Sequence, residues 1–148
     1  MLKGADMKQL LLKVVVLGLT VISSAQATSL TVDSSGIDPT AKLGANLTLF
    51  DNVTIAAIAA VQDGAILQSG VSIGTGAFVG AGCKIQSGAT IDVGAVIGTG
   101  VIIGAGVYIG PNAAIGDGAT IGDNARVEAG AKVPANAVIA NSADVMPQ

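Results

Sequence analysis

The chain has 148 residues, which suits one domain of ordinary size, and its formal net charge is −3. It has no basic run, which argues against a nucleic-acid-binding surface, and its single cysteine excludes a disulfide framework or a metal site of several cysteines. Hydrophobic residues make up 51% of the chain but aromatic residues only 2%, so small and aliphatic side chains must fill a narrow, regular core.

Residues 1–27 have the pattern of a secretory signal peptide. Lys8 and Lys13 give a positively charged start, an apolar run covers 14–22, and residues 25–27 (AQA) fit a small-x-small cleavage site. The apolar run is much shorter than the ~20 residues of a membrane-spanning helix. We therefore expect cleavage and export to the periplasm or beyond, with membrane contact only through an uncleaved segment.

The remainder of the chain divides into a lead-in or cap at 28–36 and a repeat domain at 37–148. From Ile37 to Val145 an aliphatic residue recurs at every sixth position, and all 19 of these positions are Ile, Leu or Val. An α-helix cannot carry this pattern, because a period of six does not match its turn and would scatter the aliphatic side chains around its surface. A short strand and a corner in every repeat fits instead.

Two further positions follow the same period. The third residue after each aliphatic, from Gly64 to Asn136, is always Gly or Asn, the types that best tolerate a positive φ. The fourth is small, and Cys83 takes that place once, so we expect a buried, inert thiol. Ile58 stands where a turn favours Gly or Asn, so the corner at 56–58 is expected to differ from the others.

Residues 73–82 (IGTGAFVGAG) and 96–127 (VIGTGVIIGAGVYIGPNAAIGDGATIGDNARV) resemble the hexapeptide-repeat superfamily. The resemblance implies an all-β, left-handed parallel β-helix of about six triangular coils, each of 18 residues. It also implies an acyltransferase with a histidine general base, or a carbonic anhydrase with three histidine ligands. The chain has no histidine, so no catalytic, cofactor-binding or metal-binding residue carries over, and no cofactor is expected.

Outward strand residues that are 18 apart should stack on one face of such a coil. One face is a candidate polar binding face made of Thr54, Ser72, Thr90, Tyr108 and Arg126. Another is apolar and is a candidate surface for self-association, since exposed apolar strips mark contacts; its strand residues and flanking glycines are Ala60, Phe78, Val96, Ala114, Gly80, Gly98 and Gly116. Asp92 and Glu128 should lie two coils apart, about 10 Å, which is too far for one cation.

The sequence favours a non-catalytic, exported structural or interaction module that self-associates, as a homotrimer or end to end. One alternative is an acyltransferase-like protein with an unusual site between subunits, resting on Tyr108, Asp92 or a backbone carbonyl. Another is a glycan- or surface-binding protein whose partner is a cell-envelope glycan.

Overall fold

The computed structural model describes residues 36–148, which form 19 two-residue strands in three parallel sheets. The first sheet contains β1 (Gly36–Ile37), β4 (Thr54–Ile55), β7 (Ser72–Ile73), β10 (Thr90–Ile91), β13 (Tyr108–Ile109), β16 (Arg126–Val127) and β19 (Asp144–Val145). The second sheet contains β2 (Lys42–Leu43), β5 (Ala60–Val61), β8 (Phe78–Val79), β11 (Val96–Ile97), β14 (Ala114–Ile115) and β17 (Lys132–Val133). The third sheet contains β3 (Thr48–Leu49), β6 (Ile66–Leu67), β9 (Lys84–Ile85), β12 (Ile102–Ile103), β15 (Thr120–Ile121) and β18 (Val138–Ile139).

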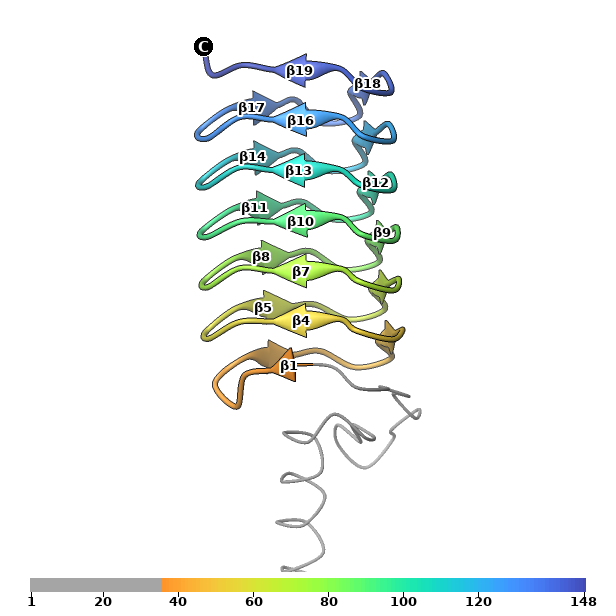
Figure 1. Cartoon of the computed structure of the whole chain (residues 1–148), viewed down its shortest axis with the longest axis vertical. Helices are drawn as coiled ribbons and strands as arrows, with labels where there is room; N and C mark the ends of the chain where they lie inside the picture. The colour runs from red at the N-terminus through yellow and green to blue at the C-terminus, as the bar shows by residue number, and fades with distance from the viewer. Residues whose placement is uncertain (1–35) are drawn as a thin grey trace, which may run out of the picture.

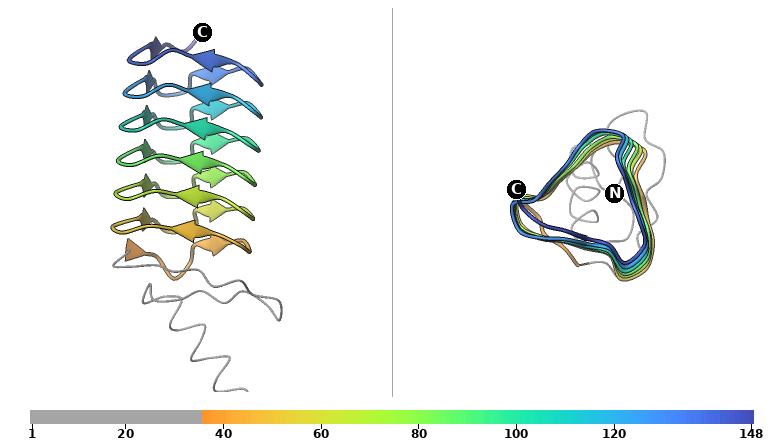
Figure 2. Two further views of the ribbon diagram at one scale, coloured as in Figure 1. Left: turned by 90° about the vertical axis from the view of Figure 1, so that its right-hand side faces the viewer. Right: turned by 90° about the horizontal axis from the view of Figure 1, so that it is seen from above.

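Neighbouring strands in each sheet are parallel and stand three places apart in chain order, as β1 and β4 do. Tyr108, for example, lies opposite Thr90 on one side and Arg126 on the other. The coils therefore stack one above the next (Figure 1), and the view from above shows a three-sided outline (Figure 2). This architecture confirms the predicted left-handed parallel β-helix of about six coils.

The core contains the two columns of apolar residues predicted from the repeat. The second residue of each strand points inward, and from Ile55 to Val133 these side chains are at most 3% exposed. The small residues two positions before them fill the remaining space, and among these Cys83 is fully buried. No polar or charged residue is buried among residues 36–148, so the polar side chains of this part of the chain are at least partly exposed.

The corners confirm the predicted role of Gly and Asn. Every residue of this column from Gly64 to Asn136 has a positive φ. Ile58 also has a positive φ, of 53°, so the expectation of a different corner there was wrong for the backbone. The Ile58 N–H donates to Thr40 Oγ1 at 2.9 Å, and the Thr40 hydroxyl donates to Asp38 at 2.6 Å, which fastens this corner to the coil before it.

Glycines that follow strands allow the coils to approach closely. A Cβ added at Gly98 would lie 2.7 Å from the backbone nitrogen of Asp117 in the next coil. The Asp117 carboxylate fills the space left by the missing side chain and accepts the Thr99 N–H at 2.8 Å. Asp123 accepts the Ala105 N–H in the same way, at 2.9 Å. These exposed corner acids are therefore also structural acceptors between coils.

The predicted signal segment at 1–27 and the lead-in, apart from Gly36, lie outside the described residues, so both stay predictions. Within the part of the chain that the structure describes, no helix has the length and apolar character needed to cross a membrane.

Two neighbouring isoleucines of β12 test the inward and outward assignment. Ile103 is fully buried and Ile102 is 39% exposed. We expect Ile103→Asp to lower the free energy of unfolding by more than about 4 kcal/mol, because it places an unpaired charge in the core and removes a buried side chain. Ile102→Asp, the matched control, should change it by less than about 1 kcal/mol. Urea unfolding of both variants measures the difference, and equal midpoints would contradict the assignment.

Ile58 provides a second test, because a β-branched residue is strained at positive φ. Ile58→Asn should raise the free energy of unfolding by about 1 kcal/mol, since a left-handed conformation costs non-glycine residues roughly 1–2 kcal/mol and asparagine tolerates it best. Ile58→Ala is the control, because it removes the side chain but keeps a Cβ in the strained conformation. Ile58→Asn should therefore melt above both the wild type and Ile58→Ala. A melting temperature of Ile58→Asn below that of the wild type would show that the Ile58 side chain stabilises the fold by more than the strain costs.

Candidate functional site

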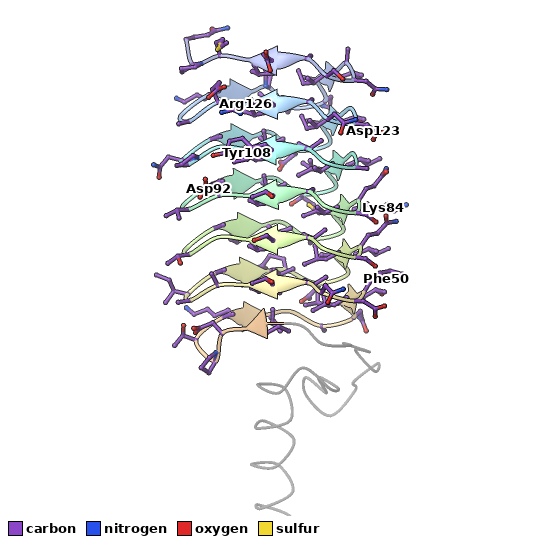
Figure 3. All side chains as sticks on the ribbon, in the orientation of Figure 1. Phe50, Lys84, Asp92, Tyr108, Asp123 and Arg126 are labelled. Atoms are coloured by element: carbon purple, nitrogen blue, oxygen red, sulfur yellow. The ribbon has the colours of Figure 1, made fainter. Side chains whose placement is uncertain are left out.

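The candidate polar face forms one continuous ladder on the first sheet. Thr54, Ser72, Thr90, Tyr108 and Arg126 follow one another in register through four parallel strand pairs. Successive residues belong to successive coils, roughly 4.8 Å apart. The largest side chains of the ladder gather at Tyr108 and Arg126, and Figure 3 shows both on the same side of the molecule as Asp92.

A carboxylate and a phenol meet at this point. Asp92 directly follows β10, and Tyr108 stands in β13 of the next coil. The Tyr108 hydroxyl donates to Asp92 Oδ2 at 2.8 Å, and the Val93 N–H donates to Asp92 Oδ1 at 2.7 Å. Both carboxylate oxygens therefore have a donor, and the phenol is held toward the preceding coil.

A cation and a second carboxylate continue the arrangement in the coil after Tyr108. The Arg126 guanidinium carbon lies 4.9 Å from the centroid of the Tyr108 ring, within the range of a cation–π contact. The Arg126 Nε–H donates to Glu128 Oε1 at 2.5 Å. One continuous series of side-chain contacts therefore crosses three coils. We call it the relay, and its members are Asp92, Tyr108, Arg126 and Glu128.

The hydrogen bonds of the relay shift the acidity of its members. The pKa of Asp92 lies below its ordinary value, first because of the Val93 N–H and then because of the Tyr108 hydroxyl. The pKa of Tyr108 is raised, chiefly because the hydrogen bond to Asp92 favours the neutral phenol, whereas the charge of Arg126 opposes the rise. At neutral pH the pair is therefore a carboxylate and a neutral phenol.

The candidate apolar face lies on the second sheet. Ala60, Phe78, Val96 and Ala114 are in register, and Phe78 and Val96 are 37% and 47% exposed. The flanking glycines have a role inside the molecule: a Cβ at Gly80, Gly98 or Gly116 would strike the backbone of the next coil. Their lack of side chains therefore follows from coil stacking and does not by itself indicate a partner surface.

The remaining candidate for chemistry is Cys83. Burial raises the pKa of its thiol, which donates a hydrogen bond to the Gly98 carbonyl oxygen at 3.0 Å. A neutral, enclosed thiol is a poor nucleophile, so Cys83 does not belong to the site. Among residues 36–148 there is no group of three or more His, Cys, Asp and Glu residues suited to a metal ion.

A family model described as bacterial transferase hexapeptide (six repeats) matches residues 82–117 and 100–141. Within these residues the chain carries the hexapeptide repeat of that family. No curated protein matches it significantly.

Solved structures similar to this chain include the acetyltransferase domain of PglB from Neisseria gonorrhoeae. That domain is 26% identical, with a TM-score of 0.74 over 76% of this chain and 54% of that chain. The same domain in complex with acetyl coenzyme A gives a TM-score of 0.66 at 26% identity, over 77% and 57%. A hexapeptide transferase family protein from Anaplasma phagocytophilum is 21% identical, with a TM-score of 0.73 over 88% of this chain and 76% of that chain. This likeness supports the fold. The chain spans about half of the PglB domain.

The likeness to an acetyltransferase domain corrects our leading functional hypothesis. The interpretation as a non-catalytic module was wrong, because the match favours the acyltransferase alternative. The hypothesis equated the lack of histidine with a lack of proton-transfer groups. The structure brings together Tyr108 and Asp92, which that alternative named, and adds Arg126 and Glu128. A signal was present in the spacing, since Arg126 follows Tyr108 by one coil and Glu128 follows Asp92 by two.

The Tyr108–Asp92 hydrogen bond can be tested optically, because Tyr108 is the single tyrosine and the chain has no tryptophan. In Asp92→Asn the carboxylate that favours the neutral phenol is gone, so we expect the pKa of Tyr108 to fall toward the ordinary tyrosine value. Ultraviolet absorbance of the phenolate across an alkaline pH series measures it. Asp123→Asn, which removes a corner carboxylate on another edge, is the control; a pKa unchanged by Asp92→Asn would contradict the contact.

Proposed function

We propose that this protein transfers an acyl group from a thioester donor to an amine acceptor at the Asp92–Tyr108 pair. The observation that carries the proposal is the 2.8 Å hydrogen bond between the Tyr108 hydroxyl and Asp92. It is supported by the likeness to the PglB acetyltransferase domain, which has been solved with acetyl coenzyme A. A thioester of that kind is therefore the donor to test first.

The transfer requires one proton acceptor near the attacking nitrogen. The amine lone pair attacks the thioester carbonyl carbon, a C–N bond forms, and the C–S bond breaks as the tetrahedral intermediate collapses. Asp92 is ionised at neutral pH and is suited to take the proton that the nitrogen loses. Asp92 then releases this proton to solvent, and the departing thiolate is protonated from solvent, so atoms and charges balance.

The weak basicity of Asp92 bears on the class of acceptor. Its two oxygens already accept hydrogen bonds from Val93 and Tyr108, and its pKa is lowered. Such a carboxylate is a poor base for an alcohol, whose O–H must lose its proton to become nucleophilic. A neutral amine is already nucleophilic, and the ammonium formed by its attack gives up a proton readily. This contrast favours N-acylation over O-acylation.

Two further properties belong to the proposal. Self-association through the candidate apolar face would enclose a site that lies on an outer surface. The exposure of Phe78 and Val96 on that face supports self-association. Export through residues 1–27 stays a prediction, and it would require an acyl donor outside the cytosol.

The test is thiol release from acetyl coenzyme A by the full chain with a panel of primary amines, including amino sugars, and matched alcohols. We expect turnover with amines, and Asp92→Asn should lower kcat roughly 10²–10⁴-fold, as loss of a general base does. Asp51→Asn, which removes an exposed carboxylate outside the relay, is the matched control and should keep full activity. Turnover that is equal in Asp92→Asn, or no thiol release above the rate in buffer with any acceptor, would contradict the proposal.

A further inference from the structure

The Tyr108 side chain is restrained at two places by different coils. Its hydroxyl donates a hydrogen bond to Asp92 in the coil before, and its ring face contacts the Arg126 guanidinium in the coil after. Tyrosine has two side-chain torsions, and a hydrogen bond at the tip together with a contact on the ring face restricts both. The direction of the phenol therefore depends on Arg126 as well as on Asp92.

Arg126 is itself held in place. Its Nε–H is bound to Glu128 at 2.5 Å, two residues further along the same coil, so the planar guanidinium has a fixed edge and a face free for the ring. The residue between Asp92 and Glu128 in their column, one coil from each, is Gly110. No side chain therefore stands in that column in the coil of Tyr108, where the phenol reaches toward Asp92.

The charges that face Tyr108 act in opposite directions. Asp92 and Glu128 raise the pKa of the phenol, and Arg126 lowers it. The charge of Asp144 in β19, the next strand of the sheet, helps to raise the pKa of Arg126. Removal of Arg126 would thus leave Tyr108 with carboxylates alone as its charged neighbours in the relay.

We propose that Arg126 is a positioning residue, held by Glu128, which fixes the direction of the Tyr108 hydroxyl at the acyl-transfer site. The inference rests on the proposed function, which places acyl transfer at the Asp92–Tyr108 pair. There the Tyr108 hydroxyl, hydrogen-bonded to Asp92 Oδ2, orients the carboxylate. Arg126 acts through Tyr108 and needs no contact with substrate.

Tyr108 supplies a direct probe of this role, since it is the single tyrosine of a chain without tryptophan. In Arg126→Gln the phenol pKa should rise further above the wild-type value, and the near-ultraviolet circular dichroism band of tyrosine should weaken as the ring gains freedom. In Arg126→Lys the positive charge remains but the planar face is lost. The pKa should then return toward the wild-type value while the band stays weak, which separates the electrostatic from the packing effect.

Glu128→Gln tests the outer link of the relay and should weaken the tyrosine band less than Arg126→Gln does. Lys132→Gln is the matched control, because it removes an equal charge from the neighbouring strand β17 on another sheet. It should leave both the pKa and the band unchanged. In the thiol-release assay, Arg126→Gln should lower kcat roughly 10-fold with little change in KM, as a loss of orientation does.

The outcomes distinguish the two proposals. If Arg126→Gln leaves the phenol pKa and the tyrosine band as in the wild type, the positioning role is wrong, whatever the activity. If both signals respond as expected but the chain transfers no acyl group, the relay stands as a structural feature and the proposed function fails. If the signals respond and kcat does not, Tyr108 is positioned but its position does not serve catalysis.

Discussion

The fixed length of each coil is the constraint on which the rest of the structure depends. Parallel backbone hydrogen bonds form because each strand residue lies opposite a residue one coil away. Tyr108, for example, pairs with Thr90 in the coil before and with Arg126 in the coil after. An insertion of one residue would turn every later inward aliphatic outward, since the side-chain period of a strand is two. The corners must therefore keep one length. From Asn46 to Ser142 the residue at this corner position always has a positive φ, and even Ile58 adopts it despite the strain.

The same constraint confines chemistry to outward positions. The inward columns are apolar and closed, and glycines such as Gly98 and Gly116 are required for contact between coils. Corner acids such as Asp117 and Asp123 are occupied as acceptors for the coil before them. Outward strand residues and the positions just after strands remain for function. The relay uses both kinds of position, with Tyr108 and Arg126 in strands and Asp92 and Glu128 just after them.

The sequence predicted the strands, the register and the positive-φ corners because each depends on residue type at a fixed period. The positions of the first strand, β1, and the last, β19, follow from the column that runs from Ile37 to Val145. The contacts of the relay could not be predicted in this way. Spacing placed Tyr108 and Asp92 within reach, but side-chain torsions decide whether they meet. The strain at Ile58 was missed for a related reason. Hydrogen bonds join this corner to the coil on each side, from the Ile58 N–H to Thr40 Oγ1 and from the Gly76 N–H to the Ala57 carbonyl, and they override the preference of one residue.

The relay is hard to explain as a device for stability. None of its four side chains is buried, and the Arg126 side chain is 55% exposed beside Glu128. Exposed ion pairs contribute little to folding because water screens them and because ordering two long side chains costs entropy. The coils beneath are already held by backbone pairing and by a closed aliphatic core. Four aligned polar side chains therefore add order to a surface that does not require it for folding. Since the outer surface carries the polar side chains of this fold, the alignment supports a role for Tyr108 and Asp92 in the proposed acyl transfer more than in the scaffold.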